Sequence, residues 1–318
     1  MQRRFIPARL TGLLCLLLTP IAIVHASPVI WESPRFQSLP LVGTIYDTRT
    51  EQTLTETQLL ERLQQHPIVL MGEKHDNPDH HQLEQRIAAA YLTAPTDQMV
   101  MEMIAYPTYL GTKISNDSTT LFDEDQALKS LLNWDAQGWP WGDYQAVVQA
   151  VSGQSIIRGG NVDKTELKAM YQGGVPNTPR FASMSDIPDS VKARITDQIF
   201  TSHCEMMPKE HLGPFVEMQL AKDASMASTL KEGATLGAER QLLIAGSFHT
   251  DKEVGVPLHL KTKGLESVTL TLIEVEDDKP KISDYLKKSG SDFLWFTPAT
   301  EEVDYCAKMR SHQSSKSN

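Results

Sequence analysis

The sequence lacks the local motifs of several common protein classes. It contains no Gly-x-Ser-x-Gly turn, no Walker loop, no Cys-x-x-Cys pair and no His-Glu-x-x-His helix. These absences exclude the usual signatures of α/β-hydrolases, P-loop proteins, thioredoxin-like redox proteins and zincins. Basic residues are also few, because 30 Lys+Arg stand against 40 Asp+Glu, a net charge of −10. Nucleic-acid binding needs basic patches that neutralise phosphates, so we expect no nucleic-acid partner.

The N-terminal residues 1–26 have the pattern of a secretory signal peptide. Three arginines precede an apolar run over residues 10–24, and the run is short for a membrane span. Ala26 fits the small residue before a signal-peptidase cut, so we expect cleavage there and a periplasmic mature chain. The alternative is a retained N-terminal anchor. Lipid attachment is not expected, because Leu14 precedes Cys15 where a lipoprotein signal has a small residue.

Cysteine is rare, and two of the three cysteines lie beyond the predicted signal peptide. In an oxidising compartment Cys204 and Cys306 are expected to form a disulfide. The alternative is a thiolate metal site that includes the neighbouring His203 and His211.

Short apolar runs alternate with helical patterns along the chain. The runs are nearly continuous, which is typical of strands buried on both faces of a parallel sheet. We therefore predict a single α/β domain over residues 27–306, with a central, mostly parallel sheet and helices on both faces. Helical insertions are expected near residues 110–154 and 164–237, and a disordered tail over residues 307–318. The predicted strands are 67–71, 99–104, 155–157, 241–245, 268–275 and 293–296.

Two of these runs end in the same pattern, Gly72–His75 and Gly246–His249. Parallel strands place their carboxyl ends at one edge of the sheet, and glycine permits a sharp turn there. We therefore expect both histidines to share one site, the alternative being two unrelated loop histidines. Glu102 lies within a third apolar run, where a buried carboxylate is costly unless it is paired. It belongs either to the same site or to a structural salt bridge.

This cluster suggests two kinds of chemistry. In a hydrolase, Glu73 and His75 would activate water while Glu102 and His249 ligate or orient. A divalent metal would be held by His75, Glu102, His249 and His80. Either His80 or the adjacent His81 is the candidate ligand from this segment. Both follow Asn77-Pro78, which is typical of a helix start, so helix capping is the alternative role.

Aromatic residues gather between Trp139 and Tyr144. Such a cluster is either part of the core or the lining of a site for a flat apolar ligand. A tyrosine oxygen there could ligate ferric haem.

These segments together resemble the ChaN-like family of iron-regulated, haem-binding bacterial proteins. The similarity covers roughly residues 55–305 and is strongest in Gly-Glu-Lys-His-Asp-Asn-Pro-Asp-His-His, residues 72–81. Glu102 and the aromatic segment also match the family pattern. Later matches are Gln219 to Met226, Ala245 to Thr250 and Gly255-Val256-Pro257.

The resemblance implies a fold related to the Tiki proteases and erythromycin esterases. It implies haem bound between two subunits through a tyrosine, a role in haem uptake, and partners such as an outer-membrane haem receptor or periplasmic transport components. We assign the ligand to Tyr144, ahead of Tyr91, Tyr106 and Tyr109. Glu73, His75, Glu102 and His249 then correspond to the superfamily's hydrolytic site, which is either active or vestigial. The sequence thus predicts a haem-binding protein, with a hydrolase as the alternative.

Overall fold

The computed structural model describes residues 28–112, 124–286, 290–307 and 309–310. The chain divides into two units, Met1–Ile30 and Trp31–Asn318, and the account below concerns the second. The predicted signal peptide lies outside the described residues. So does most of the predicted disordered tail, of which Ala307, Met309 and Arg310 have helical backbone.

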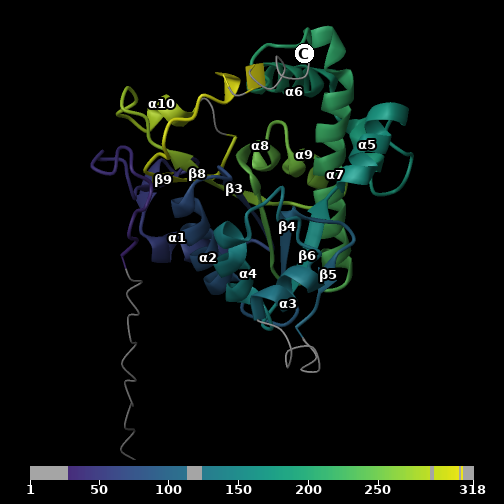
Figure 1. Ribbon diagram of the computed structural model, residues 1–318. Coiled ribbons are helices and arrows are strands. Elements are labelled where there is room, and N and C mark those ends of the chain that lie inside the picture. The colour runs from purple at the N-terminus through teal and green to yellow at the C-terminus, as the bar shows by residue number, and fades with distance from the viewer. Residues whose placement is uncertain (1–27, 113–123, 287–289, 308, 311–318) are drawn as a thin grey trace, which may run out of the picture. The chain divides into compact units, whose positions relative to one another are not determined.

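A nine-stranded sheet forms the centre of the second unit, in the order β2-β1-β9-β8-β3-β7-β4-β6-β5 (Figure 1). The six strands from β9 to β6 are parallel, while β1, β2 and β5 pair antiparallel at the two ends of the sheet. The predicted α/β fold with a mostly parallel sheet is therefore confirmed. The strands are β1 Ile45–Asp47, β2 Gln52–Leu54, β3 Ile68–Glu73, β4 Gln98–Ala105, β5 Tyr109–Leu110, β6 Ile156–Asn161, β7 Gln241–Gly246, β8 Val268–Glu274 and β9 Phe293–Thr297.

Helices cover both faces of this sheet (Figure 1). On one face α2 and α4 pack against each other and contact β7 and β6, and on the other α7 and α9 lie together over β6, β4 and β7. The helices are α1 Glu56–Leu63, α2 Pro78–Tyr91, α3 Glu124–Leu131, α4 Trp141–Val151, α5 Lys164–Gly173, α6 Asp189–Ser202, α7 Gly213–Thr235, α8 Ser247–Thr250, α9 Val256–Thr262 and α10 Ser283–Leu286, with short 3₁₀ turns η2 Ala182–Asp186 and η3 Lys209–His211.

The continuous apolar character of the strands follows from this two-sided cover. Every residue of β3 and of β7 is buried. Alternate residues of β3, Ile68 and Leu70, join Met226 and Leu230 of α7 and Leu260 of α9 in one core cluster. The other residues of the strand face the layer of α2.

Helix starts follow the local sequence. The side chain of Asn77 accepts hydrogen bonds from the backbone N–H groups of Asp79 and His80, with Pro78 at the first helical position, as predicted. Thr55 and Asp163 each form a capping box, at α1 and α5. At α2, the Asn77 cap and Pro78 therefore fix the start of the helix shortly after the end of β3.

The two stretches predicted as insertions are mainly helical where the structure describes them. Leu110 is an exception, because it belongs to the edge strand β5. Within these stretches α4 and α7 cover the sheet rather than forming a lid. Within the described part of the chain, no helix combines the length and the apolar character needed to cross a membrane.

Candidate functional site

The polar site lies at the carboxyl ends of three adjacent parallel strands. Strand β7 pairs with β3 on one side and with β4 on the other. Glu73 ends β3, Glu102 lies near the end of β4, and His249 lies on α8, directly after β7. The topology therefore brings together four residues that the sequence places in one site: Glu73, His75, Glu102 and His249.

Glu102 accepts contacts from both histidines. Its Oε1 lies 3.2 Å from His249 Nε2, and its Oε2 lies 3.6 Å from His75 Nε2. The backbone N–H of Gly246 donates to the same Oε2 at 2.9 Å. Burial alone would raise the pKa of the Glu102 carboxyl, but the charges of His249 and His75 hold it well below its usual range. Glu102 is therefore a buried anion held between two imidazoles.

His249 is bonded at both ring nitrogens, because its Nδ1 also lies 2.6 Å from Asp223 Oδ1. Burial alone would lower its pKa, but Glu102 and Asp223 outweigh that effect and raise the pKa of His249 to about 10. Burial also raises the pKa of Asp223, to about 6. Both ring nitrogens of His249 thus face carboxylate oxygens, an arrangement that suits a protonated imidazole paired with two acids.

Glu73 contacts a second group of polar side chains, beside the group around Glu102. We call Glu73 and the residues that contact it, His75, His81 and Tyr144, the Glu73 hub. Glu73 Oε1 accepts from His75 Nδ1 and from the hydroxyl of Tyr144, each at 2.8 Å, and Glu73 Oε2 lies 3.1 Å from His81 Nε2. Burial opposes ionisation of Glu73, but the hydrogen bonds from His75 and His81 lower its pKa. Burial alone would lower the pKa of His75, which is raised because Glu73 and Glu102 stabilise the protonated ring. His75 therefore contacts both buried carboxylates, Glu73 and Glu102.

The two glycines have a different role from the predicted sharp turn. Gly246 has a φ of −55°, and neither glycine adopts a positive φ. A Cβ on Gly72 would collide with Thr250 Oγ1 and lie 3.1 Å from Ser247 Cα, whereas a Cβ on Gly246 would lie 2.8 Å from His75 Nε2. Glycine is needed because α8 and His75 approach the strands closely, and Gly72 itself lies inside β3.

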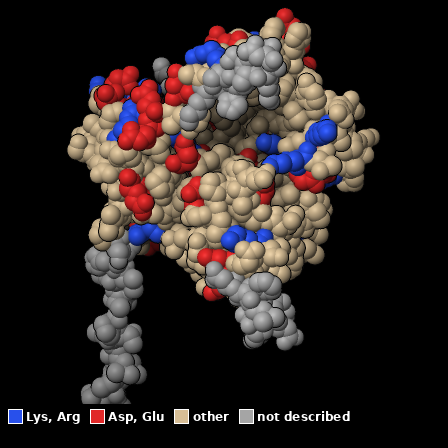
Figure 2. Space-filling model, viewed as in Figure 1, with Lys and Arg blue, Asp and Glu red and all other residues tan. Residues whose placement is uncertain are grey.

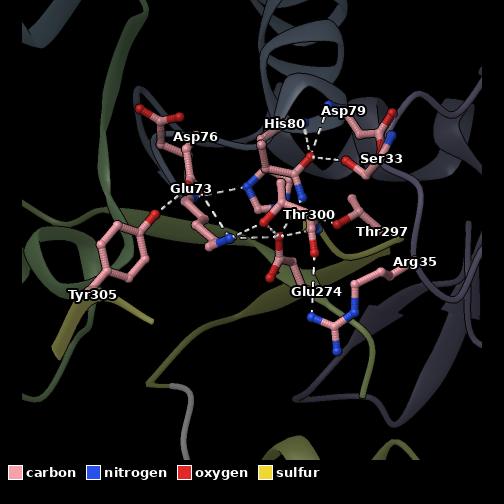
Figure 3. A network of polar contacts seen from close by, with 12 residues as sticks. Ser33, Arg35, Glu73, Asp76, Asp79, His80, Glu274, Thr297, Thr300 and Tyr305 are labelled. Carbon is pink, nitrogen blue, oxygen red and sulfur yellow. Dashed lines mark hydrogen bonds and ion pairs between the residues drawn. The ribbon is translucent and has the colours of Figure 1, made fainter. Parts of the chain in front are cut away.

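His80 does not join the site, and its assignment as a metal ligand needs correction. It is completely buried. Its Nδ1 accepts from the backbone N–H of Lys74 at 2.9 Å, and its Nε2 lies 2.9 Å from Thr297 Oγ1 (Figure 3). Burial lowers the pKa of His80 to about 3. A neutral imidazole with both nitrogens bonded fixes the β3–α2 turn and leaves no donor for a metal.

The residues after β9 form a strap across this edge of the sheet. In this C-terminal strap, residues 298–306, the Thr300 N–H donates to Glu274 at 3.0 Å and Tyr305 donates to Asp76 (Figure 3). At its end Cys306 forms a disulfide with Cys204, which follows α6. The disulfide predicted from sequence is therefore present, and it joins the end of the chain to the helical layer.

Two hollows open beside His75. One, of about 440 Å³, is lined by His75, Gly246 and Phe248 among others, and Phe248 is 54% exposed. The other, of about 480 Å³, is lined by Glu102, Trp139 and Lys222 together with residues of α5. The space-filling view shows the surface hollowed over α8 and below α6 (Figure 2). His75, which lines the first hollow, makes an edge contact with Trp139, which lines the second, at 4.8 Å between ring centroids.

Tyr144, the predicted haem ligand, is completely buried. Its ring packs at 4.6 Å from His81 and its hydroxyl donates to Glu73. Burial and the negative charge of Glu73 raise the pKa of Tyr144. That shift opposes the phenolate that ferric iron prefers. Tyr144 therefore belongs to the Glu73 hub. It is the buried aromatic residue of its segment, whereas Trp139 and Trp141 are half-buried and Trp139 lines a hollow.

Asp223 and Glu84 were not assigned from sequence, and His81 was considered only as an alternative to His80. Asp223 lies on α7 among the buried Ala221, Ala224 and Met226, and an acid in that apolar stripe is the signal that identifies it. His81 and Glu84 are three residues apart on α2, so they share a helix face. Glu84 lies beside Leu83 and Ile87, and a carboxylate at that place again indicates a buried partner.

Comparison with known proteins adds independent evidence. A family model described as "Haem-binding uptake, Tiki superfamily, ChaN" matches residues 59–260. A solved structure described as "Cofacial heme binding to ChaN of Campylobacter jejuni" is 27% identical, with 79% of this chain and 95% of that chain covered and a TM-score of 0.60. The type III effector HopBA1 is 14% identical, over 76% of this chain and 93% of its own, but its TM-score of 0.37 carries no argument. No curated protein matches the chain.

Proposed function

Because the chain belongs to the ChaN family of haem-binding uptake proteins in the Tiki superfamily, we propose that it binds haem in a haem-uptake system. The family match is the observation that carries this proposal. The motif at residues 72–81, on which the family was predicted, lies inside the matched region. The relative from Campylobacter jejuni, described as binding haem cofacially, spans most of the present chain.

The hollow beside α5 offers suitable chemistry for haem. Trp139, Met103 and Leu167 give it an apolar lining, and Lys222 provides a cation for a haem carboxylate. Ligand sites of α/β proteins lie at this edge of the sheet, beyond the carboxyl ends of the strands. We therefore assign haem to this hollow and to the surface that continues along α5.

The iron ligand is assigned to Tyr171 in place of Tyr144. Lys164 and Leu167 of α5 line the hollow, and Tyr171 follows Leu167 by four residues, on the same face of the helix. Tyr171 is 54% exposed, so iron can reach its oxygen without breaking the Glu73 hub. A tyrosine oxygen is an established ligand of haem iron.

Titration of the mature protein with ferric haem, followed in the Soret band, tests this assignment. Tyr171→Phe should remove the tyrosinate spectrum. Tyr144→Phe should retain it, as should Tyr109→Phe, which changes a tyrosine of similar exposure on β5. The absence of any Soret change in the unmodified protein would refute haem binding. Loss of the spectrum in Tyr144→Phe, with Tyr171→Phe unaffected, would refute the ligand assignment.

Dimerisation and export complete the proposal. Cofacial binding in the Campylobacter relative implies two haems face to face, which a homodimer of this chain would supply. We expect haem to shift sedimentation of the mature chain from monomer to dimer. We also expect the chain in the periplasmic fraction, where an outer-membrane haem receptor or periplasmic transport components would be its partners. Sedimentation unchanged by haem would count against the dimer, and retention of the chain in the cytoplasm would count against export.

A hydrolase is the second candidate, and one observation favours it. His75 has features of a general base, because its Nδ1 is fixed by Glu73, its Nε2 lies 3.6 Å from Glu102, and its side chain is 37% exposed and lines a hollow. Glu102 and the protonated His249 would then orient the substrate or stabilise charge. Turnover of ester or amide substrates that is lost in His75→Ala would support this function. Turnover that persists in His75→Ala would remove it.

A further inference from the structure

Three buried side chains of β3 and α2 lie close together. Glu73 ends β3, while His81 and Glu84 lie on successive turns of α2. One donor atom from each, a carboxylate oxygen or an imidazole nitrogen, lies within 4.8 Å of the other two. All three residues are buried, so the space between them is removed from bulk water.

Glu84 is the unusual member of this group. Both of its carboxylate oxygens are buried, and neither accepts a hydrogen bond from the described residues. A carboxylate in that state is costly, because desolvation is not repaid by a donor or a cation. Its helix neighbours Leu83, Ile87 and Ala88 are buried apolar residues, which offer no donors. Glu84 can share a side-chain hydrogen bond with Glu73 only if one of the two carboxyl groups is protonated, because two carboxylates offer no donor.

Two partners could satisfy Glu84. One is a proton, since burial and the nearby Glu73 raise the pKa of Glu84 well above its usual value. The other is a cation held between the two carboxylates. A proton would satisfy one oxygen of Glu84, but it would give His81 no role beyond its contact with Glu73. A divalent cation would neutralise both acids and use the His81 nitrogen that already faces Glu73 Oε2 at 3.1 Å.

We propose that Glu73, His81 and Glu84 form a binding site for one divalent first-row transition-metal ion of the Zn²⁺ type. Two carboxylates and one imidazole are a donor set that such ions accept, and three protein ligands leave one further position. The Tyr144 hydroxyl donates to Glu73 Oε1 at 2.8 Å and so contacts one of the proposed ligands. The site differs from the predicted set of His75, Glu102, His249 and His80. Among the described residues, Glu84 is the buried carboxylate without a hydrogen-bond donor, and it lies beside Glu73. It is also separate from the haem surface on α5.

Metal binding is tested on the mature, disulfide-bonded chain without haem. After chelation and dialysis, Zn²⁺ is titrated calorimetrically, and Co²⁺ is used as a probe whose visible absorption reports ligation by protein side chains. The unmodified protein should bind one equivalent, and its melting temperature should rise with metal because only the folded chain has the site. Glu84→Gln and His81→Gln should each weaken binding by more than about 100-fold, since even loss of an outer hydrogen-bond partner of a ligand costs 10–100-fold.

Glu102→Gln is the matched control variant, because it removes a buried carboxylate from the neighbouring cluster and leaves the proposed ligands in place. It should retain the Zn²⁺ equivalent. Glu84→Gln without metal should be at least as stable as the unmodified protein, since it relieves an unsatisfied buried acid, and this result also shows that the variant folds. If Glu84→Gln misfolds, the loss of Zn²⁺ binding is measured in His81→Gln instead.

Three outcomes would overturn the proposal. The first is no Zn²⁺ or Co²⁺ binding by the unmodified protein, which would assign a proton to Glu84. The second is binding that survives both Glu84→Gln and His81→Gln, which would place the ion elsewhere, for example at surface histidines. The third is binding lost in Glu102→Gln but retained in Glu84→Gln. Haem titration of Glu84→Gln should be unchanged, so the two functions are separable.

Discussion

Replacing Gly72 by alanine should destabilise the protein by about 1–3 kcal/mol, the usual effect of overpacking a well-packed interior. The added Cβ would meet Thr250 Oγ1 and lie 3.1 Å from Ser247 Cα, a backbone atom that cannot turn away. A smaller gain of about 0.4–1 kcal/mol, from restricting the unfolded chain, opposes this effect. Helix α8 carries both Ser247 and His249, so relief of the contact would also displace the histidine.

Urea denaturation measures this change as a lower midpoint with an unchanged m value. Gly142→Ala is the matched control, because a Cβ there meets nothing within 4 Å on helix α4, and it should be neutral or stabilising. Thr250→Ala removes the hydroxyl that obstructs the new methyl group. Combining it with Gly72→Ala should give a coupling energy of about 0.5–3 kcal/mol in the rescuing direction. A Gly72→Ala variant as stable as Gly142→Ala would refute the argument from close packing.

Three further changes test the energetics of the same region. Cys306→Ser should lower the free energy of unfolding by about 4.7 kcal/mol, the chain-entropy value for a loop of about 100 residues, and reduced wild-type protein should match it in chemical denaturation. His249 has a pKa of about 10 in the folded protein, against 6.5 for a free imidazole. The stability that its protonated ring contributes is therefore fully present below pH 6.5 and is lost as the pH rises towards 10. Unfolding free energies measured from pH 7 to 10 should therefore fall by up to about 1.4 kcal/mol per pH unit, and an equal slope in His249→Gln would contradict this assignment. Tyr144→Phe should cost about 1–3 kcal/mol in thermal or chemical unfolding, because Glu73 loses a buried donor, and a neutral effect would show that the hydroxyl bond contributes nothing.

The sequence predicts the interior of the sheet well because burial on both faces leaves a direct signal. The continuous apolar runs that became β3 and β7 end within two residues of their predicted positions. The antiparallel strands β1, β2 and β5 have only two or three residues each, and their pairing partners lie far along the chain or in a short hairpin. No local pattern of that length distinguishes a strand from a loop.

The site was predictable to the level of strands but not of individual hydrogen bonds. Topology brings His75 and His249 together, because the carboxyl ends of parallel strands share an edge. Adjacent residues of a helix point in different directions, and for His80 and His81 only packing decides which ring reaches Glu73 and which reaches Thr297. Of these two adjacent histidines, His80 therefore has a structural role and His81 belongs to the site.

The position of β9 in the sheet has a consequence for how this protein is made. Strand β9 lies between β1, near the start of the described chain, and β8. Among the described strands β1 pairs only with β2 and β9, so the β1–β2 hairpin has no place in the sheet until β9 has been synthesised. Strand pairing between segments this far apart is slow, because a long loop must close first. The chain should thus remain incompletely folded while it emerges from the ribosome, and the closing of its sheet is the last step rather than the first.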